Sequence, residues 1–274
     1  MKKLERYIAC AAIAAAAMWV PQCCLAAASK AVSATSPFDG TWHTNMAEAK
    51  ISPKPNVFYI GEDWYHCTSC SPEVTVKADG QDHPVTGQSY DSLSVRQIDA
   101  NSIELTAKKD GKVMFEQTRA VSANGKTLTV KTTSHPMNSD QTVVSEVTAS
   151  RVGTAPSGVH ATSGDWKIDK VKESDNGTTE TYKTNGDEIT MSDPTGETFT
   201  AKLDGQDYPV KGSYAFDTVS LKKVDAHTIE ETMKRGATVV EVNKLTVNGR
   251  TMKIESTNKL TDRTSTFVAT KKEG

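Results

Sequence analysis

The chain has 274 residues, of which 36% are hydrophobic and 24% charged, and its mean hydropathy is −0.48. These values exclude collagen-like, coiled-coil and disordered chains and predict a globular protein of about two domains. The 32 basic and 34 acidic residues leave a formal net charge of −2, so the charge balance does not point to a nucleic-acid partner. Beyond residue 34 the chain is rich in Ser, Thr, Val and Gly, which favours strands over helices.

Residues 1–34 have the pattern of a secretory signal peptide. Three basic residues lie among the first six, and an apolar stretch follows over residues 8–20. That stretch is too short for a membrane span, which needs about 20 apolar residues. Small side chains place the predicted cleavage after Ala28 or after Ala34.

The sequence also argues against a lipid anchor. Cys23 and Cys24 both lack the small-residue tripeptide that precedes a modified lipoprotein cysteine. We therefore expect a soluble protein without a membrane anchor, located in the periplasm or secreted.

The mature chain contains a tandem duplication. Residues 79–87 read DGQDHPVTG and residues 204–212 read DGQDYPVKG, with seven of the nine positions identical. Further matching segments keep an offset of 124 to 126 residues. We predict one domain over residues 35–151, a linker over 152–163, and a second domain over 164–274.

Each copy has the pattern of an antiparallel all-β meander. Short alternating runs are separated by turn dipeptides such as Asp110-Gly111 and Asn124-Gly125, which favour tight hairpins. Eight to ten strands are expected in each copy, more than one flat sheet accommodates comfortably. We expect two tandem β-barrels, because closure removes the sheet edges, and keep two-sheet sandwiches as the alternative.

Two tryptophans carry a resemblance to a known type of barrel. Gly40-Thr41-Trp42 and Gly164-Asp165-Trp166 resemble the first-strand signature of lipocalin-type proteins. The run DGQDYPVKG, followed by VDAHTIEETMKR and NGRTMKI, resembles an uncharacterised family of secreted bacterial lipocalin-like proteins. The resemblance implies a barrel core that contains Trp42 and Trp166, and an open end that holds a small apolar ligand. Pro84 and Pro209 indicate a turn or an edge strand in the repeated segment.

Cys67 and Cys70 are the only cysteines beyond the predicted signal peptide. In an oxidising compartment they are expected to form a structural disulfide that pins a turn. We expect the second copy to replace this disulfide with the turn at Asn185-Gly186. A redox couple and a metal site completed by His43 and His66 are the alternatives.

The repeated acids have a turn interpretation and a cation-site interpretation. Asp79 with Asp82, and Asp204 with Asp207, are residue types that turns prefer. A calcium site would need more oxygen ligands than these segments supply.

The sequence shows no catalytic serine elbow, phosphate loop, dinucleotide fingerprint or zinc-protease motif. We therefore expect no enzyme activity, no catalytic residue, no cofactor and no metal. The predicted function is binding of an apolar or amphiphilic small molecule. The alternatives are a ligand-free interaction or envelope-stress protein with an unknown protein partner, and a thiol-redox protein acting through Cys67 and Cys70.

Overall fold

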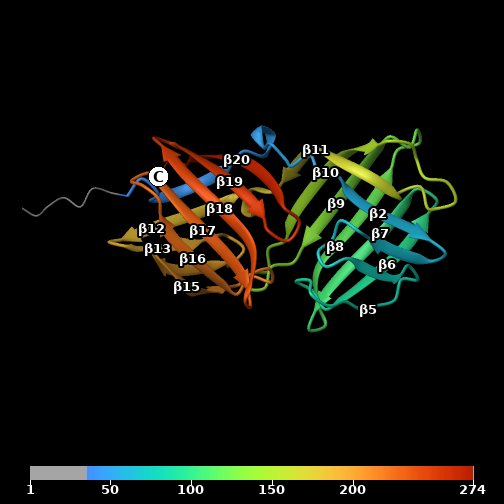
Figure 1. Cartoon of the computed structure of the whole chain (residues 1–274), viewed down its shortest axis with the longest axis horizontal. Coiled ribbons are helices and arrows are strands. Elements are labelled where there is room, and N and C mark those ends of the chain that lie inside the picture. The colour runs from blue at the N-terminus through green and yellow to red at the C-terminus, as the bar shows by residue number, and fades with distance from the viewer. Residues whose placement is uncertain (1–35, 274) are drawn as a thin grey trace, which may run out of the picture. The chain divides into compact units, whose positions relative to one another are not determined.

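The computed structural model describes residues 36–273, so the predicted signal peptide lies outside the described residues. The strands form two ten-stranded antiparallel sheets, accompanied by two short 3-10 turns, η1 (Met46–Glu48) and η2 (Asp175–Gly177) (Figure 1). No helix among these residues is both long and apolar enough to span a bilayer.

We call the two sheets barrel 1 and barrel 2. The strands of barrel 1 are β2 (Asn56–Gly61), β3 (Trp64–Cys67), β4 (Val74–Lys77), β5 (His83–Pro84), β6 (Ser92–Asp99), β7 (Ser102–Lys109), β8 (Lys112–Val121), β9 (Thr127–Ser134), β10 (Val143–Val152) and β11 (Gly164–Glu173). The strands of barrel 2 are β1 (Gly40–Thr44), β12 (Thr179–Asn185), β13 (Glu188–Ser192), β14 (Thr198–Lys202), β15 (Asp204–Lys211), β16 (Thr218–Lys223), β17 (Thr228–Arg235), β18 (Thr238–Asn248), β19 (Thr251–Asn258) and β20 (Arg263–Lys271). Barrel 2 is closed, and barrel 1 is nearly closed, with β4 and β5 close together at its two ends. The predicted all-β pair of barrels is confirmed.

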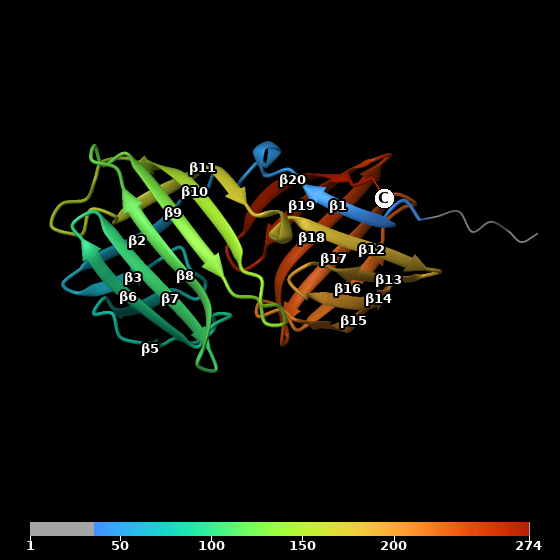
Figure 2. The ribbon, with the colours of Figure 1, turned by 180° about the vertical axis from the view of Figure 1, so that it is seen from behind.

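Each barrel contains one strand from the other sequence repeat. Strand β1 pairs with β12 and β20, both from the second repeat. Strand β11 pairs with β10 and β2, both from the first repeat. Figure 2 shows the blue strand β1 beside the brown and red strands of barrel 2, and β11 beside β10. The two Gly-x-Trp strands have therefore changed places.

The barrels consequently do not follow the predicted domain limits. Residues 35–151 lack β11 and residues 164–274 lack β1. The predicted linker, 152–163, forms most of the loop between the paired strands β10 and β11, inside barrel 1. The chain passes between barrels through residues 45–55 and 174–178 instead.

The first of these connections has a composition that favours an extended chain. Pro53 and Pro55 lie within it, and a proline biases the preceding residue towards extended conformations. The chain therefore continues away from β1 rather than turning back to pair β1 with β2 in a hairpin.

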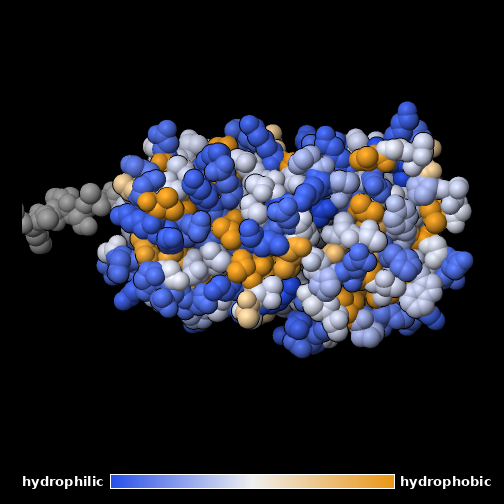
Figure 3. All heavy atoms as spheres, viewed as in Figure 1, coloured by the Kyte–Doolittle hydropathy of each residue, from blue (hydrophilic) through white to orange (hydrophobic). Residues whose placement is uncertain are grey.

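Alternating side chains and tight turns build the sheets as the sequence predicts. In β7, buried Ile103, Leu105 and Ala107 alternate with less buried residues, so that one face points inward. Both Asp110 and Gly111 have positive φ at the hairpin that follows, as a tight turn requires. Figure 3 shows hydrophilic residues dominating the visible outer face, with apolar residues interspersed.

The two prolines of the repeated segment have different environments. Pro84 ends β5, the edge strand of the barrel 1 sheet, as expected. Pro209 lies within β15, which pairs on both sides, but its pairing with β14 covers only two residue pairs. A proline is tolerated there because few ladder hydrogen bonds are required of this segment.

Candidate functional site

Barrel 1 encloses a cavity of about 260 Å³. Most of its lining is apolar and comes from the neighbouring strands β2, β11, β10 and β9: Phe58, Leu128, Val130, Val147, Ala149, Trp166 and Ile168. The disulfide Cys67–Cys70 also lines it, together with the polar side chains of Asn56, Ser69, Gln117 and Arg119. A mostly apolar cavity with a few placed polar groups is the usual form of a small-molecule site.

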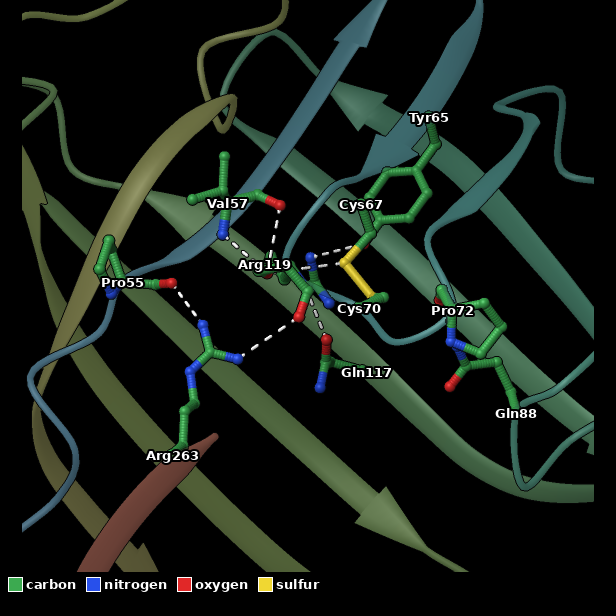
Figure 4. The surroundings of a disulfide bond; sticks show 11 residues. Pro55, Val57, Tyr65, Cys67, Cys70, Pro72, Gln88, Gln117, Arg119 and Arg263 are labelled. Atoms are coloured by element: carbon green, nitrogen blue, oxygen red, sulfur yellow. Dashed lines mark hydrogen bonds between the residues drawn. A yellow bond between two sulfur atoms is a disulfide. The ribbon is translucent and has the colours of Figure 1, made fainter. Parts of the chain in front are cut away.

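Arg119 is the one charged side chain in the lining of this cavity. Its Nε donates to Oε1 of Gln117 (2.6 Å), and its Nη1 donates to the Tyr65 hydroxyl (3.1 Å). Its Cζ atom lies 4.4 Å from the ring centre of Phe58, a cation–π distance. Figure 4 shows Arg119, Gln117 and Tyr65 beside the disulfide.

Within the part of the chain that the structure describes, no acid forms an ion pair with Arg119. None of the ion pairs formed within residues 36–273 includes it. Its hydrogen-bond partners, Gln117 and Tyr65, are both neutral. Arg119 is half-buried, so it brings a partly shielded positive charge to the lining of the cavity.

Barrel 2 has a corresponding cavity, with carboxyl groups in its lining in place of an arginine. Its volume is about 240 Å³, and Glu173, Glu180 and Glu241 line it. Behind these, Glu231 is buried, and the Tyr182 hydroxyl donates to Glu180 Oε2 (3.0 Å) and lies 3.5 Å from Glu231 Oε1.

Burial brings the pKa of two of these carboxyls close to neutral pH. Loss of water, together with the neighbouring acids, raises the pKa of Glu180 to about 7 and that of Glu231 to about 8. The acids facing Glu180 include Asp193, Glu197 and Glu241. Barrel 2 is therefore a poor environment for an anion.

Strand register shows which corresponding residues make the interiors of the two barrels different. Leu105 faces Gln117 across β7 and β8, whereas Glu231 faces Asn243 at the same place in barrel 2. Likewise Ile103 faces Arg119, whereas Ile229 faces Leu245.

At a further pair of corresponding positions, barrel 2 again has an acid where barrel 1 has a neutral residue. Asn56 faces Trp166 in barrel 1, and Glu180 faces Trp42 in barrel 2. The two copies therefore share a fold but differ in the charge of their interiors.

Trp42 and Trp166 are buried in the two cores, and each lies in the barrel of the other repeat. The indole of Trp42 donates to the carbonyl of Phe38 (2.8 Å), and that of Trp166 donates to the carbonyl of Thr162 (2.9 Å). A basic side chain covers each ring: the Lys271 Nζ atom lies 5.5 Å from the Trp42 ring centre and the Arg151 Cζ atom 4.1 Å from that of Trp166. Because the contacts of the two tryptophans match, β1 and β11 occupy equivalent places in the two barrels.

Arg151 also holds the loop that leads into β11. Its guanidinium donates to the carbonyls of Gly125 (2.6 Å), Ala161 (2.7 Å) and Ser163 (2.5 Å). These three bonds connect the β9 hairpin to the chain just before Trp166 and so help to hold β11 in barrel 1.

The predicted disulfide is present between Cys67 and Cys70. It lies at the end of β3, and Cys67 is buried with 6% of its surface exposed. Within the enclosed loop, the Ser69 hydroxyl accepts from the backbone N–H of Val57 (2.9 Å), which connects the loop to β2.

The expected replacement at Asn185-Gly186 is wrong. Asn185 faces Glu188 across a hairpin that corresponds to the one between Gly61 and Trp64, so it precedes the position of the disulfide. The corresponding loop of the second copy begins at Asp193, whose Oδ1 accepts from the N–H groups of Thr195 and Glu197, both at 2.9 Å. A carboxylate thus organises one loop and a disulfide the other.

Replacing both Cys67 and Cys70 by Ser should leave the fold intact. Because the closed loop is short and the β2–β3–β4 ladder remains, we expect a loss of about 1–2 kcal/mol of unfolding free energy and a melting temperature lower by a few degrees. Thermal unfolding monitored by circular dichroism measures this effect. Insulin-reduction activity in the wild type that disappears in the double variant would instead establish a redox function.

The repeated acids act in turns and ion pairs. Asp79 accepts from the Gln81 N–H (2.9 Å), and Asp204 accepts from the Gln206 N–H (2.9 Å). Asp82 pairs with Lys108 at 2.5 Å, and Asp207 pairs with Lys234 at 2.7 Å. All four acids thus have equivalent partners in both copies, as the turn interpretation expects.

The structure does not bring His43 and His66 to the disulfide as metal ligands. His43 lies on β1 in barrel 2 and His66 on β3 in barrel 1, and each faces a threonine hydroxyl, at 3.3 and 3.2 Å. Over residues 36–273, no group of three or more His, Cys, Asp or Glu residues is arranged to hold a metal ion.

Sequence reasoning missed Arg119 and Glu231 as interior residues. The available signal was alternation: Phe115, Gln117 and Arg119 lie on one face of β8, and Ile229 and Glu231 on one face of β17. Alternation along a strand does not say which of its two faces points into the barrel. The closed sheet in the structure shows which face is interior.

Comparisons of the chain with protein-family models, curated proteins and solved structures gave no match. The barrel fold and the two cavities are therefore the basis for any functional assignment.

Proposed function

We propose that this protein is an exported binding protein that holds a small apolar or amphiphilic molecule inside barrel 1. The observation that carries the proposal is the cavity of about 260 Å³, with its apolar lining and few polar groups. The lipocalin-like sequence pattern of the chain and its predicted signal peptide support the same function.

The site belongs to barrel 1 rather than barrel 2. An apolar ligand gains from leaving water only where the surface that it covers is also apolar. Barrel 1 offers aromatic and aliphatic side chains from Phe58 to Ile168, whereas acids line the cavity of barrel 2.

Native mass spectrometry of the protein purified without denaturation tests the proposal. We expect a bound small molecule at one copy per chain, released when the protein is denatured. The variant Val130→Phe fills the barrel 1 cavity and should remove the bound mass, since Val130 lines it. Ile254→Phe is the matched control, because Ile254 lines the cavity of barrel 2.

A protein that carries no small molecule and binds none from a panel of alkyl amphiphiles would contradict the proposal. That result would favour the alternative of an interaction or envelope-stress protein that works without a ligand. Equal loss of the bound mass in Val130→Phe and Ile254→Phe would contradict its placement in barrel 1.

A further inference from the structure

We propose that the ligand of barrel 1 carries a carboxylate, which is bound by the guanidinium of Arg119. This inference rests on the proposed function and specifies the chemical class of the ligand.

The first support is the charge balance of the cavity. Arg119 brings one positive charge into a lining that is otherwise neutral. A positive charge that is partly shielded from water forms a strong hydrogen bond with an opposite charge in direct contact, and a ligand in the cavity can supply that charge. An anionic group on the ligand would form an ion pair with Arg119.

The second support is a free donor of Arg119. Arg119 uses Nε and Nη1 for bonds to Gln117 and Tyr65, and no hydrogen bond within the described residues comes from its Nη2. The Tyr65 hydroxyl accepts from Nη1, and Tyr65 is buried in the core, so it holds the guanidinium in place. The Nη2 group is therefore the donor that Arg119 has left for a carboxylate oxygen.

The third support is that the arginine is already held in position. The amide of Gln117 accepts from Arg119 and donates to Thr132 Oγ1 (3.0 Å), so its orientation is set by β9. The ring of Phe58 lies 4.4 Å from the guanidinium carbon. A side chain fixed before binding loses little conformational freedom when the ligand arrives.

The second barrel supplies a natural comparison. Leucine occupies position 245, which corresponds to Arg119, and glutamates occupy positions 180, 231 and 241 nearby. The cavity of barrel 2 therefore offers a carboxylate no guanidinium, and one carboxylate site per chain is expected.

Isothermal titration with decanoate and with 1-decanol tests the inference, because the two probes share a chain length and differ in the head group. Wild type should bind decanoate about tenfold or more tightly than decanol, with one site per chain. In Arg119→Leu, which introduces the residue of barrel 2, decanoate affinity should fall to that of decanol. Decanol affinity should change by less than about threefold.

Two further variants complete the experiment. Arg119→Lys keeps the charge without the planar fork, so it should retain part of the preference for decanoate. Lys131→Leu is the control. Lys131 is an exposed residue of β9 that forms an ion pair with Glu146, so its replacement should leave both affinities unchanged.

The outcomes separate the two proposals. Equal affinity of the wild type for decanoate and decanol, or full decanoate affinity in Arg119→Leu, would overturn the carboxylate assignment and leave the binding function standing. Binding of neither probe by the wild type would contradict the binding function itself.

Discussion

A fragment of residues 50–174 is expected to fold as a stable monomeric barrel, whereas the sequence repeat 35–151 is not. The first fragment contains all ten strands of barrel 1, including β11 and Trp166. The second ends before β11, so it loses the partner of β2 and β10 and a core tryptophan whose removal alone costs about 3–5 kcal/mol. That is a large part of the 5–15 kcal/mol that stabilises an ordinary domain.

Circular dichroism and size-exclusion chromatography measure the difference. The strand β1 that 35–151 retains supplies five residues, where β11 supplies ten, so self-closure is a weak substitute and association through open edges is expected. A folded, monomeric 35–151 fragment together with an unfolded 50–174 fragment would show that the strands are not exchanged.

The second large effect is a loss of stability of barrel 2 as pH rises from 5 to 8. Burial raises the pKa of Glu180 to about 7 and that of Glu231 to about 8, whereas both titrate near ~4.3 in an unfolded chain. Between these limits the folded state binds more protons than the unfolded state, so stability is greatest below the unfolded pKa and declines as pH rises through the folded pKa. The two shifts together correspond to a decrease of roughly 6 kcal/mol over this range.

Urea unfolding at pH 5, 6, 7 and 8 measures this slope. Glu231→Gln keeps the shape and the hydrogen bond to Tyr182 but removes one of the two protonation changes, so its slope should be clearly shallower and its stability at pH 8 higher. Glu230→Gln is the matched control, since Glu230 is the adjacent residue of β17 and its side chain points to the opposite face. A wild-type slope of the opposite sign, or an unchanged slope in Glu231→Gln, would contradict the assignment.

The secondary structure was predictable because its signals are local. The run Ser102–Lys109, the Asp110-Gly111 turn and the run Lys112–Val121 form a hairpin, as alternation and turn chemistry predict. The pairing of Cys67 with Cys70 was predictable for the same reason, because the two residues are three positions apart and no other cysteine lies beyond the predicted signal peptide.

The exchange of β1 and β11 was not predictable from the duplication. Gly-x-Trp occurs at the start of both copies, so either strand fits either barrel by its local pattern. The choice depends on the connections over residues 45–55 and 174–178, and on long-range contacts such as that of Arg151 with Trp166. Similarity between repeats identifies a repeated unit, but not the partner with which each strand pairs.

By itself the sequence determined that this protein is a duplicated all-β chain with a short disulfide loop, because alternation, turn dipeptides and cysteine spacing act within a few residues of one another. Only the tertiary structure decided which repeat completes each barrel and which polar side chains face inward. Arg119 and Glu231 differ from surface charges only in the direction that their strands face once the sheets close. Since that direction depends on contacts between strands far apart in the chain, the difference between an arginine in one interior and carboxyl groups in the other is a property of the fold.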